Sequence, residues 1–93
     1  MIIGTLAIRV IIPGAHSLKQ KRSVLKSIKD RLRNNFNISV AEVEASEVWQ
    51  SATLGVAMVG SDRQYVNAVL SKVIDYLRNF RQIQLINYEL ELY

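Results

Sequence analysis

The chain has 93 residues, with 12 Lys and Arg against 8 Asp and Glu, one His and no Cys. This length predicts a single domain over residues 1–93, and the absence of cysteine excludes disulfides and thiolate metal sites. No apolar run approaches the roughly 20 residues of a membrane span, and the first residues carry neither a basic leader nor a cleavage site. We therefore expect a cytoplasmic protein with no membrane partner.

The first half of the chain predicts a strand, a helix and a second strand. Residues 2–12 are β-branched and apolar on both alternating sides, which is typical of a central strand. Ser17-Leu18-Lys19-Gln20 forms a capping box that begins a helix, and Asn34-Asn35 suits a left-handed stop. Residues 36–45 predict a strand whose apolar positions change phase at Ala41, which indicates a β-bulge. The apolar stripe of the helix consists of Leu18, Leu25, Ile28 and Leu32.

The second half of the chain predicts the same succession of strand, helix and strand. Residues 51–59 predict an apolar strand, and residues 61–64 (Ser-Asp-Arg-Gln) repeat the capping signature. A second amphipathic helix follows, and residues 82–93 alternate as an edge strand with a charged outer side. The order β-α-β-β-α-β predicts the ferredoxin-like α+β fold, a four-stranded antiparallel sheet with both helices on one face. The first and third strands are expected in the centre.

Positive charge is concentrated in the first half of the chain. Residues 1–40 hold eight bases and one acid, whereas residues 41–93 hold four bases and seven acids. Five bases of the first helix recur at steps of three and four and form one stripe beside the apolar stripe. Such a stripe can follow a phosphate backbone, although a solvated helix face gives the same pattern. The stripe consists of Lys19, Arg22, Lys26, Lys29 and Arg33.

Other residues near the start of this helix are weaker candidates. Lys21 falls within the apolar stripe, so it must extend past the sheet or meet a specific group. His16 and Ser17 precede the helix N-terminus and are candidates for contact with an anion or a partner, although a loop residue and a cap explain them as well. Trp49 suits either an interface anchor or a lid on a small core.

Nothing in the sequence indicates an enzyme. Glu42, Glu44 and Glu47 cluster near the predicted second strand, and the parity of Glu42 and Glu44 places both on one face. A solvated edge that forms salt bridges with the basic helix explains them better than a cation site does. No phosphate-binding loop, nucleophile elbow or zinc spacing is present. We expect no catalytic residue, no metal and no cofactor.

The central strands lack the aromatic residues with which RRM domains stack bases. Their side away from the helices instead carries small apolar residues, such as Ala7 and Ala57. A wide apolar surface is uncommon on a monomer, so we expect this side to pack against a second copy or another protein.

Several segments resemble the YlxP-like family of uncharacterised bacterial proteins (domain of unknown function 503). They are S-L-K-Q-K-R at residues 17–22, V-A-E-V at 40–43, and W-Q at 49–50 ahead of A-T-L-G-V-A at 52–57. Gln20 replaces the usual Glu but keeps the capping box. Ser51 stands where a basic residue is common, which weakens any basic contact there. The resemblance covers the chain from end to end.

The resemblance implies a small ferredoxin-like protein whose genes often lie beside those for translation initiation and ribosome maturation. It provides no activity or site residue to carry over. Together with the basic stripe, it points to a non-enzymatic protein that binds structured RNA or a ribosomal particle. Phosphate contacts are expected from Arg22, Lys26, Lys29 and Arg33, with Lys19 and Lys21 positioning the helix start. The first alternative is a homodimeric protein-interaction or regulatory module that uses the sheet. The last is an enzyme or small-ligand protein that uses His16 and Glu42 near the start of the first helix.

Overall fold

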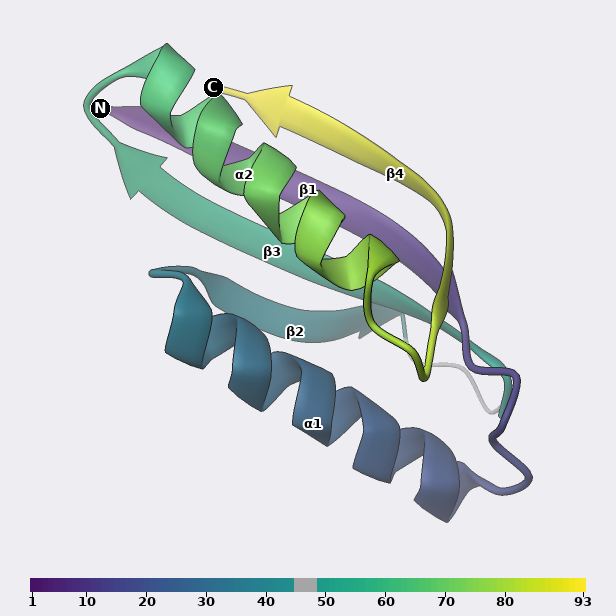
Figure 1. Cartoon of the computed structure of the whole chain (residues 1–93). Coiled ribbons are helices and arrows are strands. Elements are labelled where there is room, and N and C mark those ends of the chain that lie inside the picture. Colours follow the sequence, from purple (N-terminus) through teal and green to yellow (C-terminus); the bar gives the residue numbers. More distant parts are fainter. Residues whose placement is uncertain (45–48) are drawn as a thin grey trace.

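The computed structural model describes residues 1–44 and 49–93. Its elements are β1 (Ile2–Ile11), α1 (Leu18–Asn35), β2 (Ser39–Glu44), β3 (Ser51–Gly60), α2 (Arg63–Arg78) and β4 (Gln84–Leu92). The strands form one antiparallel sheet in the order β2-β3-β1-β4. Both helices cover the same face of that sheet (Figure 1). The predicted ferredoxin-like fold, with β1 and β3 in the centre, is therefore confirmed.

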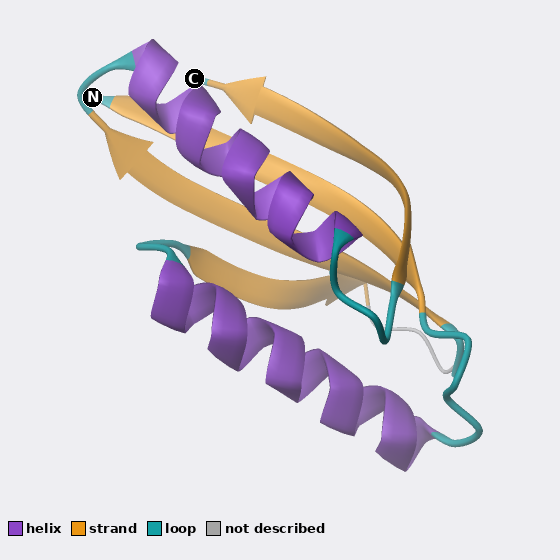
Figure 2. Cartoon of the chain, viewed as in Figure 1, coloured by secondary structure: helices purple, strands orange, loops and turns teal. Residues whose placement is uncertain are grey.

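The core lies between the sheet and the two helices (Figure 2). Alternate residues of β1 and β3 point into it, because successive side chains of a strand face opposite sides. From these strands Leu6, Ile8, Val10, Leu54 and Val56 are buried. The predicted helix stripes meet them, although Leu18 is only half-buried. The helices contribute Leu25, Ile28 and Leu32 from α1, and Val66, Leu70, Val73, Ile74 and Leu77 from α2.

Helix α2 lies very close to the sheet. A Cβ atom on Gly4 of β1 would lie 2.4 Å from Val66 Cγ1 and 2.7 Å from Leu70 Cδ1. The first turns of α2 therefore occupy space that any larger residue would fill. The helix begins at Asp62, whose carboxylate accepts a hydrogen bond of 3.0 Å from the Tyr65 N–H. The cap is thus one residue later than Ser61, which the capping signature indicated.

Helix α1 lies beside the edge strand β2. Ser17 Oγ accepts a hydrogen bond of 3.1 Å from the Gln20 N–H, which confirms the Ser17 cap. The Gln20 side chain reaches back as predicted, but it accepts from the His16 N–H, one residue before the N-cap N–H that a capping box uses. The predicted left-handed stop is wrong, because the helix continues through Asn35 and no described residue has positive φ. Asn35 Nδ2 instead donates to the Arg31 carbonyl at 2.7 Å, which satisfies an acceptor of the last turn.

Strand β2 is shorter than predicted and contains the expected bulge. Phe36 ends α1 in an extended conformation, so the strand begins only at Ser39. The register pairs Glu42 with Leu54 and Glu44 with Thr53, which leaves Val43 as the extra residue. Because Leu54 faces the helices and Thr53 the other side, the predicted common face for Glu42 and Glu44 is wrong. Neither described helix is both long and apolar enough to cross a membrane.

Candidate nucleic-acid interface

The five bases of the predicted stripe lie on the side of α1 that faces the edge of the sheet at β2. We call them the basic face: Lys19, Arg22, Lys26, Lys29 and Arg33. The direction is set by Arg33, whose Nη2 donates a hydrogen bond of 2.9 Å to the Val40 carbonyl of β2. From Lys19 to Arg33 the face follows about 21 Å of helix, at about 1.5 Å per residue.

Two members of the basic face are engaged within the molecule. Lys26 Nζ lies 2.9 Å from Asp30 Oδ2, and Arg33 Nη1 lies 3.8 Å from Asp30 Oδ1. The hydrogen bond from Lys26 lowers the pKa of Asp30, and the charges of Lys26, Arg33 and Lys29 act in the same direction. Asp30 is the one acid of this helix. It therefore acts on the C-terminal half of the basic face and leaves the N-terminal half without a counter-charge.

The other three members form no salt bridge within the described chain, although the charge of Lys29 acts on Asp30. Lys19, Arg22 and Lys29 have no salt-bridge partner within residues 1–44 and 49–93, where Lys19 and Arg22 are exposed and Lys29 is half-buried. Cations in the first turn of a helix also oppose its dipole, and this turn holds no acid. The N-terminal half of the basic face is thus the part that an external anion would stabilise most.

Lys21 is separate from the basic face. It is only 2% exposed, and its Nζ lies 3.4 Å from Glu42 Oε2 on β2. The specific group that sequence reasoning required for Lys21 therefore includes Glu42, and the expected salt bridge between the edge strand and the basic helix is confirmed. A buried ammonium cannot meet a phosphate from solvent, so this position gives no support to a nucleic-acid contact by Lys21. Glu44 is exposed, and Glu47 lies outside the described residues.

The loop before α1 and the turn before β3 lie together at one end of the sheet. The Ile12 N–H donates to the Gln50 carbonyl at 2.7 Å, and Gln50 Nε2 donates to the Ala15 carbonyl at 3.5 Å. His16 is exposed in the first segment, and Trp49 is 50% exposed in the second. Trp49 is also absent from the buried core. The structure therefore leaves it available to a partner and does not place it as a lid on that core.

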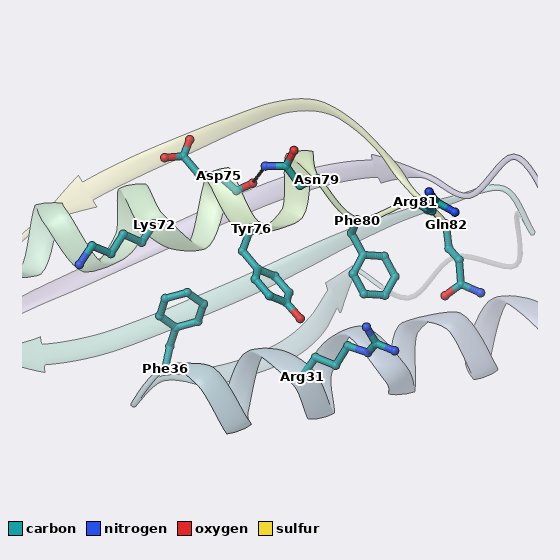
Figure 3. Close-up of a pocket in the computed structure, with 9 residues that line it drawn as sticks. All are labelled: Arg31, Phe36, Lys72, Asp75, Tyr76, Asn79, Phe80, Arg81 and Gln82. Carbon is teal, nitrogen blue, oxygen red and sulfur yellow. Dashed lines mark hydrogen bonds between the residues drawn. The ribbon is translucent and has the colours of Figure 1, made fainter.

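A groove of about 850 Å³ between the two helices was missed by sequence reasoning (Figure 3). Three aromatic rings lie in it, and Figure 3 shows them pointing from both sides into the space between α1 and α2. Arg31 of α1 stacks on one of them, with Cζ 5.3 Å from the centre of the Phe80 ring. No local pattern in the sequence links Phe80 to Arg31. The lining residues are Arg31, Phe36, Lys72, Asp75, Tyr76, Asn79, Phe80, Arg81 and Gln82.

Comparison with known proteins agrees with the resemblance seen in the sequence. The family model described as "Protein of unknown function (DUF503)" matches residues 3–90. The chain belongs to this family. "Uncharacterized protein YlxP" of Bacillus subtilis (strain 168) is 38% identical over 82 residues, which cover 88% of this chain and 89% of that protein. The family therefore extends over the whole fold described above, including both helices and the sheet.

The sheet face opposite the helices is open in the described chain and carries the small apolar residues that the strand pattern predicted there. Ala7 and Ala57 are exposed there, and a shallow groove of about 440 Å³ runs over the small side chains. Glu89 and Glu91 of β4 form one border of the groove. The Tyr93 hydroxyl donates to Glu91, and this hydrogen bond raises the pKa of Tyr93. The face is apolar in the middle and acidic at one side.

Proposed function

We propose that this protein binds structured RNA in the cytoplasm through the basic face of α1, without catalysis, and that a ribosomal particle is the natural carrier of that RNA. One observation carries the proposal. Lys19, Arg22 and Lys29 are aligned on one side of a rigid helix and have no acidic partner in the described chain. Each cation that meets a phosphate releases counterions, and this release favours binding to a polyanion.

The arrangement suits phosphate recognition and not base reading. A row of cations about 21 Å long can follow the backbone of a folded RNA, whose duplex regions are recognised mainly by shape and by phosphate contacts. The central strands β1 and β3 hold no aromatic residue for stacking. Phosphate contacts fix position without reading sequence. We therefore expect affinity that depends strongly on salt and weakly on sequence.

The test compares two triple variants of equal net charge. The first is Lys19→Gln, Arg22→Gln and Lys29→Gln, which removes the free cations of the basic face. The control is Arg9→Gln, Arg63→Gln and Arg78→Gln, which removes three exposed charges elsewhere. Binding to a synthetic RNA hairpin is measured between about 50 and 200 mM salt, and the slope of log K against log salt is compared.

The basic-face variant should bind more weakly, and its slope should be shallower by about 3, one for each lost phosphate contact. The control should keep the wild-type slope. Circular dichroism should show both variants folded, because the substituted side chains lie outside the core. Equal losses in the two variants would mean that only net charge matters. That result would overturn the assignment to α1.

A second candidate function rests on the open sheet face. The apolar groove over Ala7 and Ala57 favours a protein-interaction module, with a second copy as one partner. In that case the protein would associate with protein in a salt-insensitive way and show no affinity for the RNA hairpin. Sedimentation as a monomer at micromolar concentration would count against the homodimer.

A further inference from the structure

The groove lies where side chains of α1, of α2 and of the residues that follow each helix meet. Each helix contacts the sheet, α1 at β2 and α2 mainly at β1 and β4. Side chains, not helix backbones, therefore line the space between them. Its volume of about 850 Å³ is within the range of about 300–1,000 Å³ that is common for small-molecule sites.

The floor of the groove is a row of three rings. The centres of Phe36 and Tyr76 are 6.0 Å apart with the rings edge to face, and those of Tyr76 and Phe80 are 6.4 Å apart and tilted by 44°. All three side chains are only half-buried, so part of each ring faces the groove. Partly exposed ring faces of this kind are the surfaces on which nucleobases stack.

The charges around the rings favour an anion. Arg31, Lys72 and Arg81 border the groove against a single acid, Asp75. Figure 3 shows the Asp75 carboxylate on the side of α2 away from the rings, whereas Arg31 reaches up beside Phe80. The guanidinium of Arg31 already lies over the Phe80 ring, so a planar group stacks on this aromatic surface. A ligand that is both planar and anionic satisfies the rings and the cations together.

We infer that this groove binds one nucleotide, with its base against the exposed part of the Tyr76 ring, next to the Phe80 ring that Arg31 covers, and its phosphate beside Arg31 and Arg81. The Gln82 side chain lines the same space and can hydrogen-bond a base edge. The nucleotide is either free or an unpaired residue of an RNA strand, because both present the same base and phosphate. This site is distinct from the basic face and does not depend on it, since Arg31 is not a member of that face.

The experiment is an NMR titration of the full chain, in which backbone amide shifts are followed as ligand is added. The probes are AMP, UMP, inorganic phosphate, a short single-stranded oligouridine and an acidic peptide. Tyr76→Leu removes the ring but keeps apolar bulk, and Arg31→Gln removes the charge without touching the core. The matched control is Arg63→Gln, which makes the same charge change on α2, outside both the groove and the basic face.

A nucleotide or the oligouridine should shift the amides of the groove residues, and inorganic phosphate at the same concentration should not. Tyr76→Leu should weaken nucleotide binding roughly 5- to 100-fold, as expected for loss of base stacking. Arg31→Gln should weaken it as well, and Arg63→Gln should leave it unchanged. Binding of AMP or UMP as tight as that of the oligouridine identifies free nucleotides as the ligand, whereas preference for the oligouridine identifies an unpaired RNA residue.

Several results would overturn the inference. They are shifts that avoid the groove, equal shifts with inorganic phosphate, equal or tighter binding of the acidic peptide, or equal effects of Arg31→Gln and Arg63→Gln. The RNA hairpin experiment tests the basic face separately from the groove. Loss of hairpin binding in the Lys19, Arg22 and Lys29 variant does not involve the rings. The two proposals can therefore fail independently.

Discussion

Helices α1 and α2 cover the same face of one sheet but are held there differently. Helix α2 contributes a broad apolar side and approaches the sheet so closely that Gly4 is required beneath it. Helix α1 has a narrower apolar contact and is fastened by polar groups, with Lys21 paired to Glu42 and Arg33 bound to the Val40 carbonyl. The helix with less of its surface in the core leaves more of it for charge. The helix at the edge is thus the one to which we assign the contact with RNA.

The largest expected effect on the free energy of unfolding tests the close packing of α2 against the sheet. Gly4→Ala places a methyl group against Val66 and Leu70 and should lower the free energy of unfolding by about 1–3 kcal/mol, the usual cost of overpacking. Gly14→Ala is the control, because no heavy atom lies within 4 Å of a Cβ built there. Urea unfolding measures both. Equal stability of the two variants would show that α2 is not closely packed at this point.

A smaller effect tests the polar attachment of α1. Glu42→Gln removes the counter-charge of the buried Lys21 ammonium and should lower the free energy of unfolding by about 1–2 kcal/mol, because a buried charge then loses part of its compensation. The control is Glu44→Gln on the same strand, where the carboxylate is exposed and the change should stay within about 0.5 kcal/mol. No difference between them would mean that the ion pair does not hold α1.

The smallest effect on stability concerns the exposed side of α1. The pKa of Asp30 is lowered, chiefly by its hydrogen bond from Lys26, so Asp30 favours folding above its ordinary pKa and loses that contribution as pH falls through the lowered value. NMR titration of the carboxyl should show this, and Lys26→Gln should raise the pKa back toward normal. Asp30→Asn should leave stability nearly unchanged and tighten binding to the RNA hairpin a few-fold. Weaker binding would contradict the proposed role of the basic face.

The regular elements could be predicted because each depends on local periodicity. Alternation gave the strands, the change of phase at Ala41 gave the bulge at Val43, and steps of three and four gave the basic face. The wrong prediction of a common face for Glu42 and Glu44 has a physical cause. The bulge shifts the parity of every residue after it, so Glu42 and Glu44 face opposite sides of the sheet.

Contacts between distant elements left no local signal. The partner of Lys21 is set by how α1 lies on β2, and only the fold brings Glu42 to it. The groove likewise joins Phe36, from the end of α1, to Tyr76 and Phe80, about forty residues further along the chain. Each of these rings is an ordinary apolar residue in its own segment. Their common surface exists only once both helices lie on the sheet.

The central position of β1 has a consequence for how the chain folds. This strand pairs with β3 and with β4, and Ile3 exchanges hydrogen bonds with Tyr93, nearly the full length of the chain away. Such high contact order slows folding, because the chain loses loop-closure entropy before the strand pairings stabilise it. During synthesis on a ribosome β1 is made before β3 and β4. Its apolar sides therefore stay uncovered until these strands have been made. The nascent chain therefore passes through a stage in which β1 is exposed to aggregation or to chaperones.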